Sequence, residues 1–160
     1  FSKVRRRRIT MAKQLNIAGA RIGFKNFTGL EGAYNKEGER SFAVFLDDEL
    51  AETLLADGWN VKFPKPREST SDEEDTRQPH LAVEVAFGKF PPKIVTITND
   101  IPKVLSEEEV NTLDWLEIEN VDLVINPYHW SVNGNSGVKA YLKAIYATIE
   151  SDMFSQKYGI

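Results

Sequence analysis

The strongest constraint on the fold is a pair of strand-like segments in the last third of the chain. Residues 121–132 and 138–149 are rich in β-branched and aromatic residues, and residues 133–137 between them contain Asn133-Gly134. The Asn-Gly pair readily adopts the positive φ angles that a hairpin turn requires. We therefore predict that the two segments form one long antiparallel β-hairpin.

The two faces of this hairpin differ in chemistry, because alternate side chains of a strand lie on the same face. One face of the second arm carries Lys139, Tyr141 and Lys143. Its opposite face is apolar and is expected in the core: Val138, Ala140, Leu142 and Ala144. On the first arm, Tyr128 and Trp130 also share a face.

A strand face that alternates cations and aromatic rings suits a single-stranded nucleic acid, because Lys can contact a phosphate while a ring stacks on a base. A simpler interpretation explains the same residues. Strands favour aromatic side chains in any protein, and Lys on an exposed face also contributes to solubility. The hairpin alone does not separate these two interpretations.

Composition places the chain among globular proteins. It has 160 residues, 41% of them hydrophobic and 28% charged, which is enough for one domain with a core. No apolar run approaches the roughly 20 residues of a membrane span, and no apolar segment follows the basic N-terminus as in a signal peptide. The absence of cysteine excludes disulfides and Cys-based zinc or nucleophile chemistry, and it fits a reducing cytoplasm.

The charge is distributed unevenly along the chain. Residues 1–10 contain Lys3 and Arg5–Arg8 and no acid, which leaves 15 basic against 24 acidic residues, a net charge of −9, for residues 11–160. Since Met11 resembles a natural start, we expect residues 1–10 to be a non-native or disordered basic extension; a nucleic-acid-binding arm is the alternative. An acidic body argues against binding over the whole surface, so binding would depend on a local basic groove.

The remaining pattern predicts a mainly β, β-rich α+β protein. Besides the hairpin arms, strands are expected at residues 15–27, 40–46, 59–63, 81–87 and 94–98. Gly19 and Gly23 suggest a bend or bulge in the first of them. Two short helices are expected, one at residues 49–57 capped by Asp47 or Asp48, and one opened by Ser106 with Glu109 as a capping box. About seven strands with two short helices indicate a small β-barrel.

The expected core includes one set of alternate strand residues: Phe42, Val44, Leu81, Val83, Val85 and Leu142. Trp59 and Trp115 are expected in the core or at its rim. In residues 15–27, Arg21, Lys25 and Phe27 fall on one face, with Ile22 and Phe24 on the other.

Residues 64–79 contain five acids between prolines and small polar residues, so we expect a mobile acidic loop inside a single domain of residues 11–160. Metal binding by these acids is less well supported, because the run lacks the Gly and terminal Glu of a calcium loop.

The sequence offers no catalytic constellation. Its only histidines, His80 and His129, are 49 positions apart, and local spacing places no Ser, Cys or Asp beside either one. A P-loop and a dinucleotide fingerprint are both absent. We therefore expect no enzyme activity, no cofactor and no metal.

Several motifs together resemble a known family. They are residues 24–29 (FKNFTG) with Tyr34-Asn35, residues 57–61 (DGWNV), residues 91–94 (PPKI), residues 120–128 (NVDLVINPY) and residues 137–143 (GVKAYLK). This combination is similar to the single-stranded-DNA-binding proteins of tailed bacteriophages, which are usually described as OB-folds. The similarity runs from about residue 15 to residue 149. It implies an OB-fold-like barrel, binding of single-stranded DNA in replication or recombination, action in the host cytoplasm and no catalysis.

One feature departs from the best-known single-strand-binding proteins. Their acidic recruitment segment lies at the C-terminus, whereas here the acidic segment is internal, at residues 68–75. We therefore do not expect recruitment through an acidic C-terminal tail. The implied partners are single-stranded DNA and phage replication or recombination proteins, with no membrane, and a homo-oligomer is compatible with the sequence.

The predicted site combines stacking rings and phosphate-binding cations. For stacking, we predict Tyr128, Trp130 and Tyr141, with Phe27 and Tyr34 behind them. For phosphate, we predict Arg21, Lys25, Lys36, Arg40, Lys139 and Lys143. The alternative hypothesis is a phage structural or adaptor protein that uses the same sheet as a protein–protein interface.

Overall fold

The computed structural model describes residues 13–32, 36–63 and 78–150. The predicted extension at residues 1–10, Tyr34, and residues 64–77 of the predicted acidic loop lie outside the described residues. The described strands are β1 (Leu15–Ile17), β2 (Arg21–Asn26), β3 (Arg40–Phe45), β4 (Val61–Lys62), β5 (His80–Val85), β6 (Lys93–Thr98), β7 (Ile101–Leu105), β8 (Ile118–Val132) and β9 (Asn135–Ile149). Within these ranges the structure has one α-helix, α2 (Asp48–Ala56), and one 3₁₀ helix, η1 (Val110–Asp114).

The strands form one mixed sheet in the order β1-β8-β9-β5-β3-β2. β9 pairs parallel with β5 and with β6, while β7 pairs with β6 and β4 pairs with β5. β1 and β2 are consecutive in the chain but lie at the two ends of this order, and they do not pair with each other. The sheet is therefore curled but not closed, and a backbone hydrogen bond of 2.8 Å runs from Ala20 N, just before β2, to Val121 O of β8.

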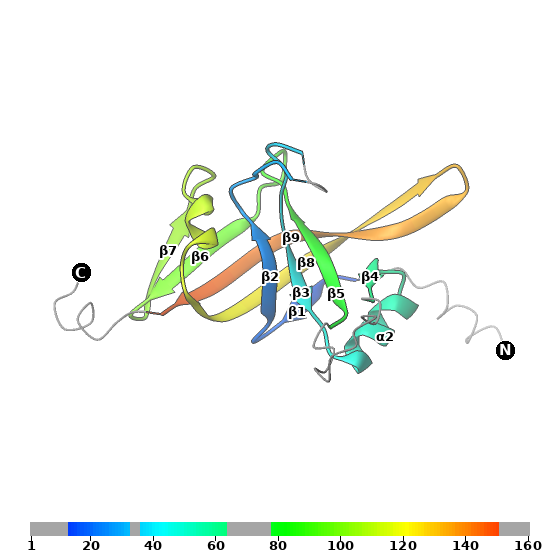
Figure 1. Ribbon diagram of the computed structural model, residues 1–160, viewed down its shortest axis with the longest axis horizontal. Helices are drawn as coiled ribbons and strands as arrows, with labels where there is room; N and C mark the ends of the chain where they lie inside the picture. The colour runs from blue at the N-terminus through cyan, green and yellow to red at the C-terminus, as the bar shows by residue number, and fades with distance from the viewer. Residues whose placement is uncertain (1–12, 33–35, 64–77, 151–160) are drawn as a thin grey trace, which may run out of the picture.

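The predicted hairpin is confirmed as β8 and β9, which cross the whole molecule and project beyond the other strands (Figure 1). Its turn is shorter than residues 133–137, because only Asn133 and Gly134 lie between the strands, with φ angles of 50° and 82°. Positive φ at both central residues matches the twist of a hairpin.

A bulge at Lys143 reverses the alternation of β9. Ala144 pairs with Val124 and Leu142 pairs with Ile125, so Lys143 has no partner residue across the hairpin. Before the bulge the even-numbered residues face the core, and after it the odd-numbered ones do, with Ile145 fully buried. One extra residue in a strand has this effect because side chains alternate with a period of two.

The predicted core is confirmed, since every residue assigned to it is buried: Phe42, Val44, Leu81, Val83, Val85 and Leu142. Trp59 is also buried, whereas Trp115 is 68% exposed, so a core position for Trp115 is wrong. The reason lies in η1. Residues three apart in a 3₁₀ helix share a face, and Val110 and Leu113 already fill the core side.

The predicted strand of residues 15–27 divides into β1 and β2, and a second bulge reverses its faces. The pairing of β2 with β3 shifts between Gly23 and Asn26, and Phe24 has a φ of 49°. Phe27 therefore turns inward, fully buried, with its ring stacked 5.3 Å from that of Phe42. Phe24 turns outward and is 72% exposed.

Of the two predicted helices, only the first is an α-helix. α2 begins at the predicted cap, where Leu50 N donates to Asp47 Oδ1 at 2.7 Å. At the second position Ser106 N donates to Glu109 Oε1 at 3.0 Å, but only the short η1 follows. The Asp114 carboxylate accepts hydrogen bonds from the backbone of residues 27 and 28, and β8 begins at residue 118. These contacts tie the end of η1 to the start of the loop after β2.

β7 was absent from the predicted elements. Residues 101–104 are all exposed, so they lack the alternation of buried and exposed positions that marks a strand. The strand forms because Asn99 and Asp100, with φ angles of 52° and 64°, turn the chain back along β6.

Candidate nucleic-acid interface

The predicted rings and cations of the hairpin lie on one face, which we call the hairpin platform: Tyr128, Trp130, Lys139, Tyr141 and Lys143. Tyr128 pairs with Lys139, and Asn126 pairs with Tyr141, so their side chains project on the same side of the two strands. The rings of Tyr128 and Tyr141 meet edge to face with centroids 5.9 Å apart. Tyr128 is 55% exposed, while Trp130 and Tyr141 are half-buried.

Trp130 is held in place by the glycine opposite to it. A Cβ atom on Gly137 would come within 2.9 Å of Trp130 Cζ2 and 3.0 Å of Cε2, so the indole lies directly against the glycine backbone. This support covers part of the ring and leaves the remainder accessible. The ring is therefore positioned on a strand before any ligand arrives.

A groove of about 530 Å³ separates the platform from the turn between β5 and β6. On the platform side it is lined by Tyr128, Tyr141 and Lys143, and on the other side by Lys89 and Phe90. Phe90 is 83% exposed, and Lys89 Nζ lies 5.7 Å from the centroid of its ring. Sequence reasoning treated this segment as a turn only, although it repeats the alternation of cation and ring used to find the hairpin.

The carboxylate of Glu84 contacts a lysine of the hairpin platform. Glu84 of β5 pairs with Tyr141 of β9, and its Oε1 is 3.0 Å from Lys139 Nζ. The hydrogen bond with Glu84 is the main cause that raises the pKa of Lys139, against the opposing effect of partial burial. Burial, followed by the negative charge of Glu84, raises the pKa of Tyr141. At neutral pH Lys139 is therefore charged, but its charge is already compensated within the structure.

Removing this acid should strengthen the binding of an anion. We expect Glu84→Gln to tighten oligo(dT) binding about threefold to fivefold at 0.1 M salt, because it frees Lys139 to neutralise about one more phosphate. The dissociation constant measured at two salt concentrations tests this expectation. Glu52→Gln on α2 makes the same change of charge and serves as control. Equal affinities for Glu84→Gln and the wild type would show that Lys139 contacts no phosphate.

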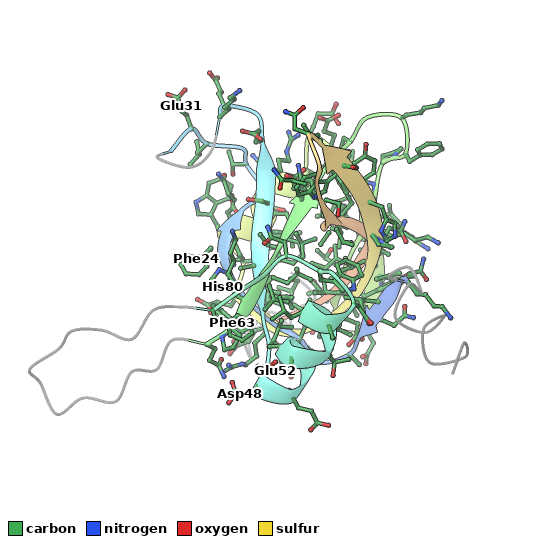
Figure 2. The ribbon with its side chains drawn as sticks, turned by 90° about the vertical axis from the view of Figure 1, so that its right-hand side faces the viewer. Phe24, Glu31, Asp48, Glu52, Phe63 and His80 are labelled. Carbon is green, nitrogen blue, oxygen red and sulfur yellow. The ribbon has the colours of Figure 1, made fainter. Side chains whose placement is uncertain are left out.

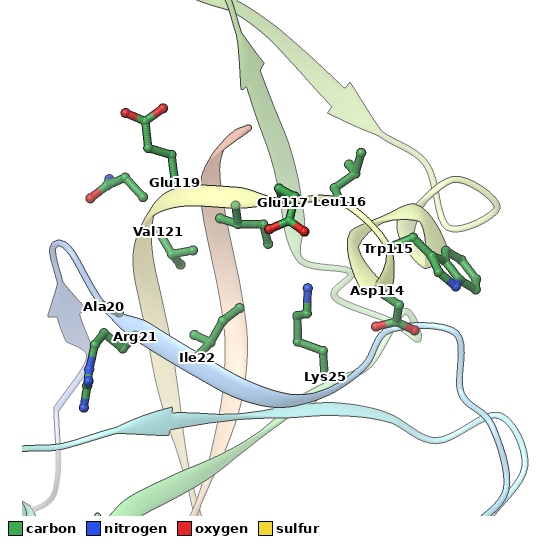
Figure 3. A pocket seen from close by; sticks show the side chains of 12 residues that line it. Ala20, Arg21, Ile22, Lys25, Asp114, Trp115, Leu116, Glu117, Glu119 and Val121 are labelled. Atoms are coloured by element: carbon green, nitrogen blue, oxygen red, sulfur yellow. The ribbon is translucent and has the colours of Figure 1, made fainter. Parts of the chain in front are cut away.

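Arg21 and Lys25 diverge, contrary to the prediction that they share a face. Lys25 points into a pocket of about 430 Å³ between β2, η1 and the start of β8, and its Nζ donates to Leu113 O at 3.0 Å (Figure 3). Arg21 lines the edge of the same pocket, but its guanidinium is directed toward Phe45, with its Cζ 5.9 Å from the centroid of the Phe45 ring. The pocket is also lined by Glu117 and Glu119, whose charges oppose phosphate binding near Lys25.

Arg40, another predicted phosphate-binding residue, makes structural contacts. Arg40 Nε donates to Phe27 O at 2.9 Å, its Nη1 lies 3.2 Å from Glu107 Oε2, and its guanidinium lies over the ring of Phe87. Arg40 thus fixes the loop after β2 and is largely covered.

The prediction of Phe27 as a stacking residue is wrong, because its ring is in the core. Lys36 is exposed in the loop before β3.

Two chemical features are absent from the part of the chain that the structure describes. Among residues 13–32, 36–63 and 78–150, no three His, Asp or Glu side chains cluster as metal ligands would. Over the same residues, no helix is both long enough and apolar enough to span a bilayer.

A curled β-sheet with rings and cations on one face fits a β-rich nucleic-acid-binding protein. A family model described as a putative phage ssDNA-binding domain matches residues 2–160, and the chain belongs to this family. The family expected from the sequence motifs is therefore confirmed, and with it binding of single-stranded DNA as the function. No curated protein sequence matches the chain significantly.

The fold is also similar to solved structures of the single-stranded DNA-binding protein from bacteriophage Enc34. A C-terminally truncated form aligns with a TM-score of 0.53 and 10% sequence identity, over 88% of this chain and 87% of that one. The same protein in complex with ssDNA aligns with a TM-score of 0.51 and 9% identity, over 88% of each chain. At these identities the comparison concerns the fold alone.

Proposed function

We propose that this protein binds single-stranded DNA on the hairpin platform and in the adjoining groove, without catalysing a reaction. The observation that carries this proposal is the placement of Tyr128, Tyr141 and Lys143 opposite Lys89 and Phe90 across one groove. Bases can stack on the rings, each contributing about 1–3 kcal/mol, while the ammonium groups neutralise phosphates. Contacts of this kind favour an unpaired strand, because the bases of a duplex are already stacked on each other.

The strand order supports an OB-fold-like barrel as the scaffold. Such a barrel is a partly open, five-stranded Greek key. Here β1 and β2 correspond to two halves of the barrel's first strand. One half lies at each end of the order β1-β8-β9-β5-β3-β2. The parallel pairing of β5 with β9 brings the hairpin beside the middle of the sheet. On this proposal residues 11–160 form a single domain.

The family supports a proposal for the biological setting. The Enc34 protein, which shares the fold, has been solved in complex with ssDNA. We place the present protein with phage DNA during replication or recombination, in the cytoplasm of the infected host. Its role there is to cover exposed strands, with other phage replication or recombination proteins as partners.

A fluorescence titration with oligo(dT) tests the proposal. We expect quenching of the tryptophan fluorescence and saturable binding whose logarithmic salt dependence has a slope of about −0.7 for each phosphate neutralised. Duplex DNA of the same length should bind more weakly, and base preference should be slight. Oligomerisation without any quenching by DNA would instead favour the structural or adaptor protein.

A further inference from the structure

A second group of aromatic rings lies outside the hairpin platform, on β2, β3 and β5. Phe24, Phe45 and His80 contact one another, with ring centroids 6.0 Å apart for Phe24–Phe45, 5.7 Å for Phe24–His80 and 6.3 Å for Phe45–His80. The guanidinium of Arg21 lies over the ring of Phe45, and we call these four side chains the Phe24 cluster. Figure 2 shows Phe24 and His80 together on one face of the sheet, near Phe63, which is 44% exposed.

The backbone at Phe24 is unfavourable for an aromatic residue. Its φ of 49° lies in the left-handed region, where a bulky side chain is uncommon. The bulge that creates this conformation also directs the ring into solvent, where it is 72% exposed. Both features reduce stability, and a glycine at this position would avoid both of them.

Strain of this kind persists where the conformation serves a function, and bulges commonly redirect a side chain next to a binding site. The neighbouring residue supports the same conclusion. A Cβ on Gly23 would come within 2.6 Å of Phe45 Cε2, so the ring of Phe45 lies on the glycine backbone. The arrangement repeats the support of Trp130 by Gly137 in the hairpin platform.

The cluster and the platform lie on the same side of the sheet. Tyr141 pairs with Glu84, Glu84 pairs with Ser41, and Phe45 is four residues further along β3. Two strand spacings and four residues give a separation of about 16 Å along the sheet. Between them lie the small residues Ala43 and Ala82, paired with each other, of which Ala82 is exposed and Ala43 is buried.

This separation fits one DNA strand. At the spacing of 3.4 Å per nucleotide within a duplex strand it corresponds to about five nucleotides, and OB-folds cover about 4–16 nucleotides. Arg21 provides the positive charge that phosphates require, beside rings of the kind on which bases stack. The chemistry of the cluster therefore complements the DNA that occupies the platform.

We propose that the Phe24 cluster is a second base-stacking site for the DNA strand bound at the hairpin platform. The proposal rests on the proposed function, because the platform supplies the first contact. The strand would leave the groove, cross β5 at the exposed Ala82, and place a base against Phe24 beside Arg21.

Phe24→Gly gives the sharpest test, because it removes the ring and relieves the positive φ together. We expect about fivefold to tenfold weaker binding of a dT oligomer of about 12 nucleotides, the effect of losing one stacked base. The melting temperature should stay the same or rise, since glycine adopts positive φ without steric strain. A purely structural ring would show the reverse, with lower stability and unchanged affinity.

One control and two further measurements make the result specific. Ile101→Ala removes an equally exposed apolar side chain from β7 and should bind DNA like the wild type. Arg21→Gln should reduce the salt slope by about 0.7, the amount for one phosphate. Photocrosslinking of a 5-iodouracil-substituted oligomer should label the peptide that contains Phe24 or His80.

The failure of this inference is distinguishable from failure of the proposed function. One outcome refutes the second stacking site and leaves the proposed function standing. In that outcome the wild type binds the oligomer and Trp130→Ala weakens binding, but Phe24→Gly binds like the wild type and no crosslink reaches the cluster. If the wild type itself does not bind the oligomer, the proposed function fails and this inference fails with it.

Discussion

Trp130→Ala should weaken the binding of oligo(dT) about tenfold or more, since one stacked base contributes about 1–3 kcal/mol and 1.4 kcal/mol corresponds to a factor of ten. The melting temperature should change little. The ring lies near the hairpin turn, half-buried against Gly137 and remote from the main core. Fluorescence anisotropy of a labelled oligomer measures the affinity, and thermal unfolding measures the stability.

Three related variants separate stacking from other effects. Trp130→Phe keeps a ring and should recover part of the affinity. Gly137→Ala keeps the indole but displaces it, because the new Cβ would come within 2.9 Å of its ring, so affinity should fall without loss of the tryptophan. His129→Ala alters the adjacent residue on the opposite face and should bind normally. A large fall in stability with Trp130→Ala, without a fall in affinity, would make Trp130 a packing residue.

Reversing two charges in the groove should have the largest effect. Lys89→Glu combined with Lys143→Glu should weaken binding at least about 25-fold at 0.1 M salt, because two phosphate contacts are lost and each changes the logarithmic salt slope by about 0.7. The slope itself should become shallower by about 1.4. Both lysines line the same groove, one on each side, so the double variant tests the groove as a unit.

The matched control for this variant changes net charge equally at a distance from the groove. Lys13→Glu with Lys103→Glu alters a residue before β1 and one on β7, whose exposed ion pair with Glu109 should contribute little to stability. Binding should then fall only slightly. Similar losses in the two double variants would mean that DNA responds to total charge and that the groove has no special role.

The position of Lys89 and Phe90 beside the hairpin could not be predicted from the sequence. Their alternation of cation and ring was visible in the chain, but a turn can point in any direction. Only the pairing of β6 with β9 brings this turn next to the hairpin, more than 30 residues later in the sequence. The carboxylate of Glu84 reached Lys139 in the same way, through the parallel pairing of β5 with β9.

The sequence by itself determined the hairpin and its two faces, because Asn133-Gly134 sets the turn and alternation sets the faces through local interactions alone. It also determined the central core, where Phe42 and Val83 are buried as their alternation predicts. The tertiary structure decided where the alternation reverses. A single extra residue in β2 moved Phe27 into the core and Phe24 into solvent, because one bulged position exchanges the faces of every residue that follows it.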